Sequence, residues 1–468
     1  MCHHLSSKFL ATTGFRQTWL VFGKGENKTS TRGMAHLPGM LKRGWRASQS
    51  TAGLLASLAS LASLASVTSV LAGSDARGEK SSAASAKCEF EYDGDFLRNL
   101  SGGLHQGNTY NGFIKLGETL GFGDWLDPAD ESSERREIAL HASLIFPHGD
   151  SLSREDVGDL NGVSNYDTHA GLRLFSLWAE ENFYSGSLSI RMGIWALDKG
   201  SGFWQSEGAG HFLNSGFGTF PVVSYGMVAP VYPVSAPCIR VEWKPDEAQP
   251  LTLRTAIFSG DVGTPTENRH NTRWNLSASK GVSLFAEAQY KLQSSDGSPG
   301  GTYKAGGFYD SQGYEDLSGA QSHHGNCGFY AIADQNVSSI ITGAPRELAV
   351  FAKFALAPKD RNFVAFDTEG GISYTGLFAT NDGHEDVLAL GIGHSTISDR
   401  ARDDVGNAFS KYGETVLELT YQAHLTILER QGGFSVLVQP DLQYIINPGA
   451  VTTTPNALVG GVRFTARF

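Results

Sequence analysis

The sequence has little cysteine, a low share of charged residues and a single long apolar run, and each shortage excludes a class of protein. Only 4 of its 468 residues are cysteine, none in a CxxC pair, so neither a disulfide framework nor a cysteine zinc site is expected. Charged residues make up 18% of the chain, and the mean hydropathy of −0.20 is far from that of a polytopic helical membrane protein. The net charge of −11 argues against nucleic-acid binding, which needs a basic surface to neutralise phosphates.

The single apolar run is AGLLASLASLASLASVTSVLAG, residues 52–73, and Lys42, Arg43 and Arg46 precede it. A basic stretch, an apolar run and then small residues are typical of a secretory signal peptide. A transmembrane anchor is the alternative, although the many serines and alanines make the run less apolar than anchors usually are. Translation is then expected to begin at Met34 or Met40, because a start at residue 1 would place an unusually long segment before the apolar run.

These observations predict the following division of the chain. Residues 1–39 are a non-genuine or disordered extension, 40–72 a signal peptide cleaved near 72 or at 86, and 73–107 a short periplasmic segment. The cysteines that remain after cleavage, Cys88, Cys238 and Cys327, are expected to be incidental.

From residue 108 onward the apolar residues recur with a period of two, which is typical of β-strands. The segments SLSIRMGIW (187–195) and TVLELTYQAHLTI (415–427) each place apolar side chains on one face and Ser, Arg, Glu, Thr or Gln on the other. A β-sandwich would also alternate, but charged residues in mid-strand and runs of nine to thirteen residues favour a membrane barrel. An exported chain without a spanning helix can cross lipid only as a closed barrel, because every backbone polar group must be paired.

The C-terminal stretch ALVGGVRFTARF (457–468) fits the same interpretation. Phe464 and Phe468 are expected to face lipid, while Arg463 and Arg467 point into the lumen or the periplasmic rim. A final aromatic residue after alternating apolar positions is the usual ending of bacterial outer-membrane barrels. The expected fold is therefore all-β: a transmembrane antiparallel β-barrel over residues 108–468, preceded by a cleaved signal peptide.

The sequence resembles the carbohydrate-selective porin (OprB) family over 108–468. The resemblance is carried by an ordered series of segments: DLNGVSNYDTHAGLRLFSLWAEEN (159–182), LSIRMGIWALDKGSGFW (188–204), HFLNSGFGTFP (211–221), APVYPVSAPCIRVEWKP (229–245), FAKFALAPKDRNFV (351–364) and VQPDLQYIINPG (438–449). It implies a sixteen-stranded antiparallel barrel for passive diffusion of glucose and similar sugars across an outer membrane. Lys199 departs from the acidic residue common in the family, which bears on the sugar preference rather than the fold.

The resemblance also implies a set of channel residues that would contact the sugar: Arg173, Trp178, Arg191, Asp198 and Trp204. Further candidates for the channel are Arg240, Asp334, Gln335 and Arg361. Aromatic rings suit the apolar faces of a sugar, and guanidinium and carboxylate groups suit its hydroxyls.

Several of these positions have a structural alternative. Arg191 either contacts sugar or stiffens the barrel. Arg173 and Trp178 have opposite parities, so one of them faces lipid unless a bulge intervenes, and a lipid-facing Trp178 would belong to an aromatic belt. Trp204 either contacts the sugar or has no contact with it. Asp198 is either a hydrogen-bond acceptor in the constriction or a turn residue.

Arg240 is expected in a charge ladder with Glu242 and Lys244. Asp334 and Gln335 lie on an inward loop or on a lumen face. Arg361, with Lys359 and Asp360, is expected in a strand-end turn with local ion pairs. His323 and His324 are expected in an exposed loop rather than in a metal site.

No enzyme motif is present: GIGHS near Gly391 lacks the order of a nucleophile elbow, and nothing fixes the separation of Asp261 and Glu287 as a glycosidase pair. We therefore expect a porin without cofactor or metal, whose partners are monosaccharides and the outer-membrane bilayer, as a homotrimer or a monomer. A general or ion-passing porin, and a secreted β-rich carbohydrate-binding protein or glycosidase, are the alternatives.

Overall fold

The computed structural model describes residues 85–123, 137–198, 202–227, 229–245, 250–274, 276–293, 299–319, 321–338, 347–378, 385–404, 409, 412–428 and 434–467. The expected extension, signal peptide and residues 73–84 lie outside these ranges, as do Lys199 and Phe468.

The described residues include sixteen strands. They are β1 (Ser85–Ser101), β2 (Gly107–Gly123), β3 (Glu137–Gly149), β4 (Arg173–Phe183), β5 (Leu188–Trp195), β6 (Ala236–Trp243), β7 (Leu251–Ser259), β8 (Val282–Gln293), β9 (Pro299–Glu315), β10 (Ser322–Asn336), β11 (Glu347–Leu356), β12 (Val364–Thr375), β13 (Val387–Ile397), β14 (Glu414–Leu428), β15 (Phe434–Ile446) and β16 (Ala457–Arg467).

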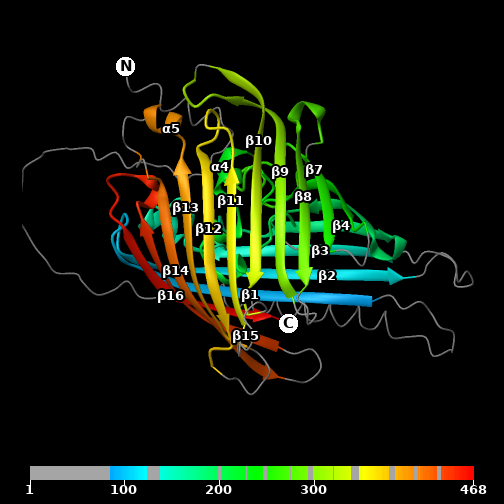
Figure 1. Cartoon of the computed structure of the whole chain (residues 1–468), viewed down its shortest axis with the longest axis horizontal. Helices are drawn as coiled ribbons and strands as arrows, with labels where there is room; N and C mark the ends of the chain where they lie inside the picture. The colour runs from blue at the N-terminus through cyan, green and yellow to red at the C-terminus, as the bar shows by residue number, and fades with distance from the viewer. Residues whose placement is uncertain are drawn as a thin grey trace, which may run out of the picture. The chain divides into compact units, whose positions relative to one another are not determined.

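The strands form one closed barrel in which each pairs antiparallel with its neighbours in sequence, and β1 pairs with β16. The colours of Figure 1 follow this order from β1 to β16. Closure leaves no strand edge unpaired, as a barrel in lipid requires. The predicted all-β barrel and its sixteen strands are confirmed.

The predicted start of the barrel at residue 108 is wrong, because β1 begins at Ser85 and pairs with both β2 and β16. The missed strand reads EFEYDGDF (89–96), in which aromatic or glycine residues alternate with carboxylates. This alternation is the signal that would have identified it.

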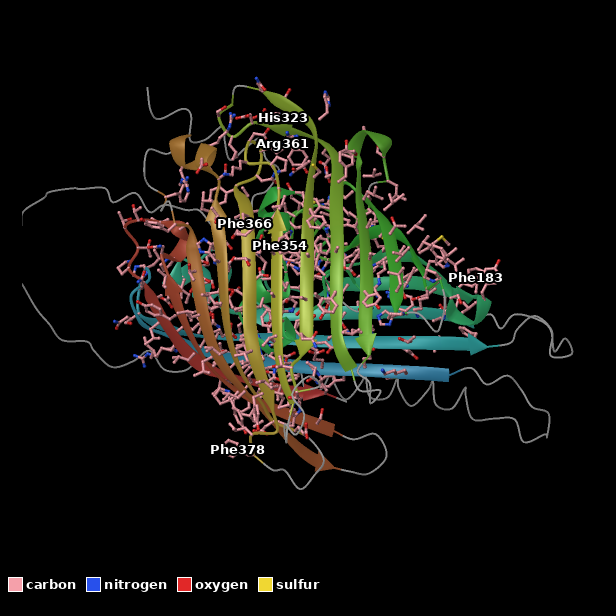
Figure 2. The ribbon with its side chains drawn as sticks, in the orientation of Figure 1. Phe183, His323, Phe354, Arg361, Phe366 and Phe378 are labelled. Carbon is pink, nitrogen blue, oxygen red and sulfur yellow. The ribbon has the colours of Figure 1, made fainter. Side chains whose placement is uncertain are left out.

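The two faces of the sheet differ as the period of two predicts. Large apolar side chains lie exposed on the outer face, including Phe354 and Phe366 on the neighbouring strands β11 and β12 (Figure 2). On β16, Phe464 is 43% exposed while its neighbour Arg463 is 5% exposed and faces inward. Arg467 forms an ion pair with Glu91 of β1. The predicted orientations of Phe464, Arg463 and Arg467 are therefore confirmed.

The connections lie at two ends of the barrel. We call the end where β1 finishes the loop end, and the end where β1 begins the terminal end. The helical turns are η1 (Ser153–Val157), η2 (Tyr184–Gly186), η3 (Ala209–His211), α3 (Ser215–Gly218), α4 (Pro221–Gly226), η4 (Ala278–Lys280), α5 (Asp399–Asp404) and η5 (Pro448–Ala450). Within the described ranges, no helix has the length and apolar character to span a membrane.

Candidate functional site

Two connections from the loop end pack against the inner face of the barrel wall. The first inward loop is residues 150–172, between β3 and β4, and the second inward loop is 196–235, between β5 and β6. Phe203 and Phe220 of the second inward loop are buried in one cluster with Phe285 and Tyr330 of the wall. Burial of aromatic side chains contributes strongly to stability, so this loop is a fixed part of the lumen.

Five carboxylates on the lumen face of the strands, the wall carboxylates, accept hydrogen bonds from backbone N–H groups of these loops. Glu418 accepts from Leu213 N at 2.5 Å and Asn214 N at 3.0 Å. The other four pairings are Glu287 with Trp204 N at 2.7 Å, Asp334 with Gly208 N at 3.1 Å, Asp367 with Val222 N at 2.8 Å, and Glu414 with Leu160 N at 2.6 Å and Asn161 N at 3.0 Å. Satisfied buried donors hold a loop in place because leaving them unpaired is costly.

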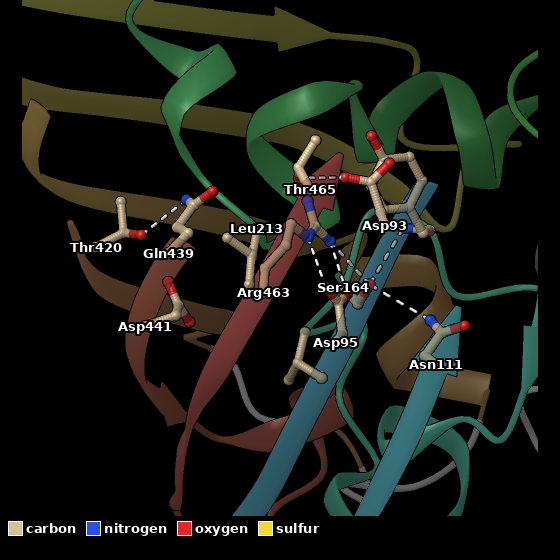
Figure 3. A network of polar contacts seen from close by, with 12 residues as sticks. Asp93, Asp95, Asn111, Ser164, Leu213, Thr420, Gln439, Asp441, Arg463 and Thr465 are labelled. Carbon is tan, nitrogen blue, oxygen red and sulfur yellow. Dashed lines mark hydrogen bonds and ion pairs between the residues drawn. The ribbon is translucent and has the colours of Figure 1, made fainter. Parts of the chain in front are cut away.

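The first inward loop is also tied to the seam that closes the barrel. Arg463 of β16 donates two hydrogen bonds to Asp95 of β1, from Nε at 2.6 Å and from Nη2 at 2.7 Å. Ser164 of the loop donates to the same carboxylate at 2.6 Å, and beside it Thr465 donates to Asp93 (Figure 3). The closure of the sheet and the position of the loop therefore share one buried polar network.

A β-bulge turns both Arg173 and Trp178 towards the lumen. The register between β3 and β4 shifts between Ser143 and Leu144, which leaves Phe175 as an extra residue on β4. One extra residue reverses the alternation of side chains along a strand, so two positions of opposite parity reach the same side.

Trp178 lies in the lumen wall with both ring faces covered. His141 of β3 stacks on the indole with ring centroids 4.8 Å apart, and the guanidinium carbon of Arg191, on β5, lies 3.9 Å from the ring centroid. Because β3 and β5 flank β4 on opposite sides, these partners occupy opposite faces of the ring. Trp178 is thus neither a residue of a lipid-facing aromatic belt nor an open platform for a sugar ring.

Arg191 and Arg240 share the carboxylate of Glu180. Arg191 Nε donates to Glu180 Oε2 at 2.7 Å, and Arg240 Nη2 donates to Glu180 Oε1 at 2.8 Å. Arg254, farther along the wall, bridges Glu242 at 2.6 Å and Glu287 at 2.7 Å. Arg240 is thus ion-paired with Glu180, a partner that the sequence reasoning missed. Of the partners expected for Arg240, Glu242 pairs with Arg254 and, at 3.8 Å, with Lys244.

Arg173 is a buried arginine whose hydrogen bonding is incomplete. It is 1% exposed, and Nη2 donates to Pro265 O at 3.1 Å. Within the part of the chain that the structure describes, its Nε and Nη1 have no hydrogen-bond partner. Burying an N–H group without an acceptor costs free energy. A ligand oxygen that accepts a hydrogen bond from Nε or Nη1 would therefore be favoured at this position.

Two further predicted channel residues lie inside the second inward loop. Asp198 is 8% exposed and accepts a hydrogen bond from Tyr232 N at 2.9 Å, which makes it a residue that shapes the loop. Trp204 is 1% exposed and packs edge-on against Phe220 and Tyr330. The expectation of a sugar contact for Trp204 is wrong, because its ring has no exposed face.

The remaining three residues have different positions. Asp334 faces inward and also accepts from Ser206 Oγ at 2.6 Å. Gln335 lies on the outer face, where it pairs in register with Val350 and hydrogen-bonds Tyr303, so its expected lumen position is wrong. Arg361 lies in the connection between β11 and β12 and donates to Asp360 from Nε at 2.8 Å and Nη2 at 3.1 Å, as the expected ion-paired turn.

Two acidic groups of the first inward loop have shifted ionisation. Burial raises the pKa of Asp159 to about 6 and that of Asp167 to about 7. Ser151 donates a hydrogen bond to Asp167, which opposes the effect without cancelling it. Both carboxyls change charge near neutral pH because water is excluded around them.

One strip of the lumen wall keeps solvent contact. Lys115 of β2 donates to Glu89 of β1 at 2.9 Å, with the two side chains 28% and 32% exposed. Thr119 and His141 form a 2.8 Å hydrogen bond beside them. We call these four residues the open strip. It offers paired donors and acceptors for hydroxyl groups, in contrast to the wall carboxylates covered by the loops.

Comparisons with known proteins agree with this architecture. Residues 134–468 match the model of the family described as "Carbohydrate-selective porin, OprB family". Porin B of Pseudomonas aeruginosa is 24% identical over 417 residues, covering 81% of this chain and 87% of that protein. The high-pH structure of Pseudomonas putida OprB superposes with a TM-score of 0.67 at 22% identity, covering 82% of this chain and 94% of that chain.

The closed sixteen-stranded barrel, the two inward loops and the family match over more than half of the residues lead to one conclusion. The chain belongs to the OprB family of carbohydrate-selective porins.

Proposed function

We propose that this porin passes glucose and similar neutral monosaccharides by passive diffusion, and that residues 40–72 direct its export to the outer membrane. Outer-membrane barrels have their longer loops outside the cell, so the loop end faces the exterior and the terminal end the periplasm. One chain encloses the whole path, so conduction does not require a second copy.

The observation that carries the proposal is the pairing of charge around the lumen. Glu180 neutralises Arg191 and Arg240, Asp95 neutralises Arg463, and the wall carboxylates bind loop N–H groups. A lumen whose charges are paired internally attracts ions weakly, while its exposed donors and acceptors still replace the water around sugar hydroxyls. The route proposed for the sugar runs between the inward loops and the open strip.

Arg173 is the proposed sugar contact, because its Nε and Nη1 groups have no partner within the described residues and suit a hydroxyl oxygen. Since the side chain is 1% exposed, the proposal requires the connection that carries Pro265 to move aside when sugar binds. Glucose should reduce the ion current of single channels in planar bilayers as it occupies the pore. Since a hydrogen bond to a charged group contributes about 1.5–3 kcal/mol, Arg173→Met should raise the half-blocking glucose concentration about tenfold. Arg98→Met is the matched control, because Arg98 is exposed and pairs in register with Gly460 on the outer face.

Liposome swelling separates this function from the alternatives. Faster entry of glucose than of a disaccharide or of a charged solute of similar size supports the selective porin. Equal entry of all small solutes indicates a general porin, and no swelling by folded protein indicates that the chain is no channel. Unchanged glucose block in Arg173→Met would contradict the assignment of Arg173 alone.

A further inference from the structure

Three side chains that bind metals in other proteins meet at the loop end of the barrel. Asp316 follows directly after β9, His323 is the second residue of β10, and Asp360 lies in the connection between β11 and β12. Figure 2 shows His323 beside Arg361, the neighbour of Asp360 in sequence. Three separate segments therefore place one imidazole and two carboxylates together, and the sugar path does not use them.

The spacing of the three groups suits a small divalent cation. His323 Nε2 lies 3.5 Å from Asp316 Oδ2 and 3.5 Å from Asp360 Oδ2, and all three atoms lie within 4.8 Å of one another. For zinc bound at roughly 2.0–2.1 Å from each ligand, the edge of a tetrahedron is about 3.3–3.4 Å. The two separations from His323 match this edge to within about 0.2 Å, and an ion would draw the two carboxylate oxygens, at most 4.8 Å apart, to the same separation.

Neighbouring groups hold the carboxylates in this orientation. Ser318 donates to Asp316 Oδ1 from its backbone N at 2.8 Å and from its hydroxyl at 2.5 Å, which leaves Oδ2 directed at His323. Arg361 donates from Nε to Asp360 Oδ1 at 2.8 Å and from Nη1 to Gly325 O at 2.8 Å. Such outer contacts orient the ligands of metal sites. His323 Nε2 is shielded from solvent and makes no hydrogen bond within the described residues.

The charges around the cluster decide which cation fits. The backbone N–H and the hydroxyl of Ser318 both donate to Asp316, and these hydrogen bonds favour the ionised carboxylate over the neutral acid. Arg361, and Arg400 with Nη1 at 3.2 Å from Asp316 Oδ2, already balance the two carboxylates. Any preference of this site for one cation over another must then come from the type of ligand atoms rather than from excess negative charge. An imidazole with two carboxylates suits zinc and similar first-row cations, whereas calcium and magnesium prefer oxygen ligands alone.

We propose that Asp316, His323 and Asp360 bind a divalent first-row transition cation, which ties the turn between β9 and β10 to the connection between β11 and β12. The bound ion fixes these two segments at the mouth of the barrel. The competing arrangement is a protonated His323 that bridges the two carboxylates without metal, and the two arrangements respond differently to added zinc.

The test is calorimetric titration of zinc chloride into the full chain, purified in detergent and first treated with a chelator. Cys88→Ser and Cys327→Ser are introduced in all proteins, because both thiols are exposed and free. His323→Ala removes the nitrogen ligand, and the matched control is His324→Ala, which removes the adjacent, exposed imidazole. Gel mobility without heating shows that each variant is folded.

The parent protein and His324→Ala should bind one more zinc equivalent than His323→Ala, or bind it at least about tenfold more tightly. Asp316→Asn should show the same loss as His323→Ala, and calcium or magnesium should not compete. Equal zinc binding by the parent and His323→Ala overturns the proposal. The proposal is also overturned if the parent protein binds no zinc but lowering the pH alone immobilises the turn between β9 and β10 and the connection between β11 and β12. That result would favour the protonated His323 bridge. Neither result bears on sugar conduction.

Discussion

Replacing Asp334 with alanine should loosen the second inward loop without unfolding the barrel. The side chain of Asp334 projects from the lumen face of β10, and its Oδ1 accepts from Ser206 Oγ at 2.6 Å and from Gly208 N at 3.1 Å. It is 8% exposed, so water competes weakly for these donors. Both of these donors belong to the second inward loop, so the substitution removes two loop contacts at once.

The size of the effect follows from these two hydrogen bonds. Hydrogen bonds to a charged acceptor contribute about 1.5–3 kcal/mol each, so alanine removes about 3–6 kcal/mol of local anchoring. Because about 1.4 kcal/mol corresponds to a tenfold change in an equilibrium, the population with residues 202–211 detached should rise by about a hundredfold or more. Asp334→Asn keeps an oxygen acceptor at the same place and should lose much less.

Two measurements check this prediction. Amide hydrogen exchange at residues 202–211 should accelerate in Asp334→Ala, and the rate of disaccharide entry into liposomes should rise relative to that of glucose. Glu242→Gln is the control for lumen charge, because Glu242 pairs with Arg254 and Lys244 rather than with a loop. Parental exchange rates and a parental ratio of sugar entry in Asp334→Ala would refute the anchoring role.

Three further predictions concern the wall and the first inward loop. Glu418→Ala should increase entry of larger sugars in swelling assays, because two buried N–H groups of the second inward loop lose their acceptor; an unchanged size limit would contradict this. Arg463→Ala should lower the free energy of unfolding by about 3–5 kcal/mol, measured in urea, because Asp95 stays buried without its partner; adding Asp95→Leu should restore part of the loss. The pKa of Asp167, raised to about 7 in the folded protein, means that the folded state binds more protons than the unfolded state, so stability is highest below about pH 4 and falls as the pH rises through 7. Thermal unfolding from pH 4 to 8 should show this slope, and Asp167→Asn should flatten it.

The period of two was enough to predict the fold class and the orientation of side chains on single strands. It placed Arg463 inward and Phe464 outward, because alternation along one strand is a local property. The same rule puts Asp334 and Gln335 on opposite faces of a strand, so the shared lumen position expected for the two residues disregarded the local pattern. The number of strands came from the resemblance alone.

The candidate site was harder to predict because its contacts join distant segments. Glu418 and its partner Leu213 are 205 residues apart, and nothing near either residue in the sequence indicates the pairing. Charged lumen residues were therefore read as groups facing water, whereas five of them accept N–H groups of the inward loops. Trp178 shows a second limit, since a bulge of one residue at Phe175 changes the face of a strand without a distinct sequence signal.

The bulge at Phe175 allows the length of β4 to change by one residue without a change in the pairing of the barrel strands. In genetic terms it is one codon: deletion of Phe175 would leave Arg173 and Trp178 four positions apart in a regular strand, so both side chains would still face the lumen. The antiparallel hydrogen bonding to β3 and β5 and the closure at β1 and β16 need no change. The bulge therefore lets β4 carry one additional residue without moving either lumen side chain to the lipid face, so a single in-frame change of length at this point leaves the membrane fold intact.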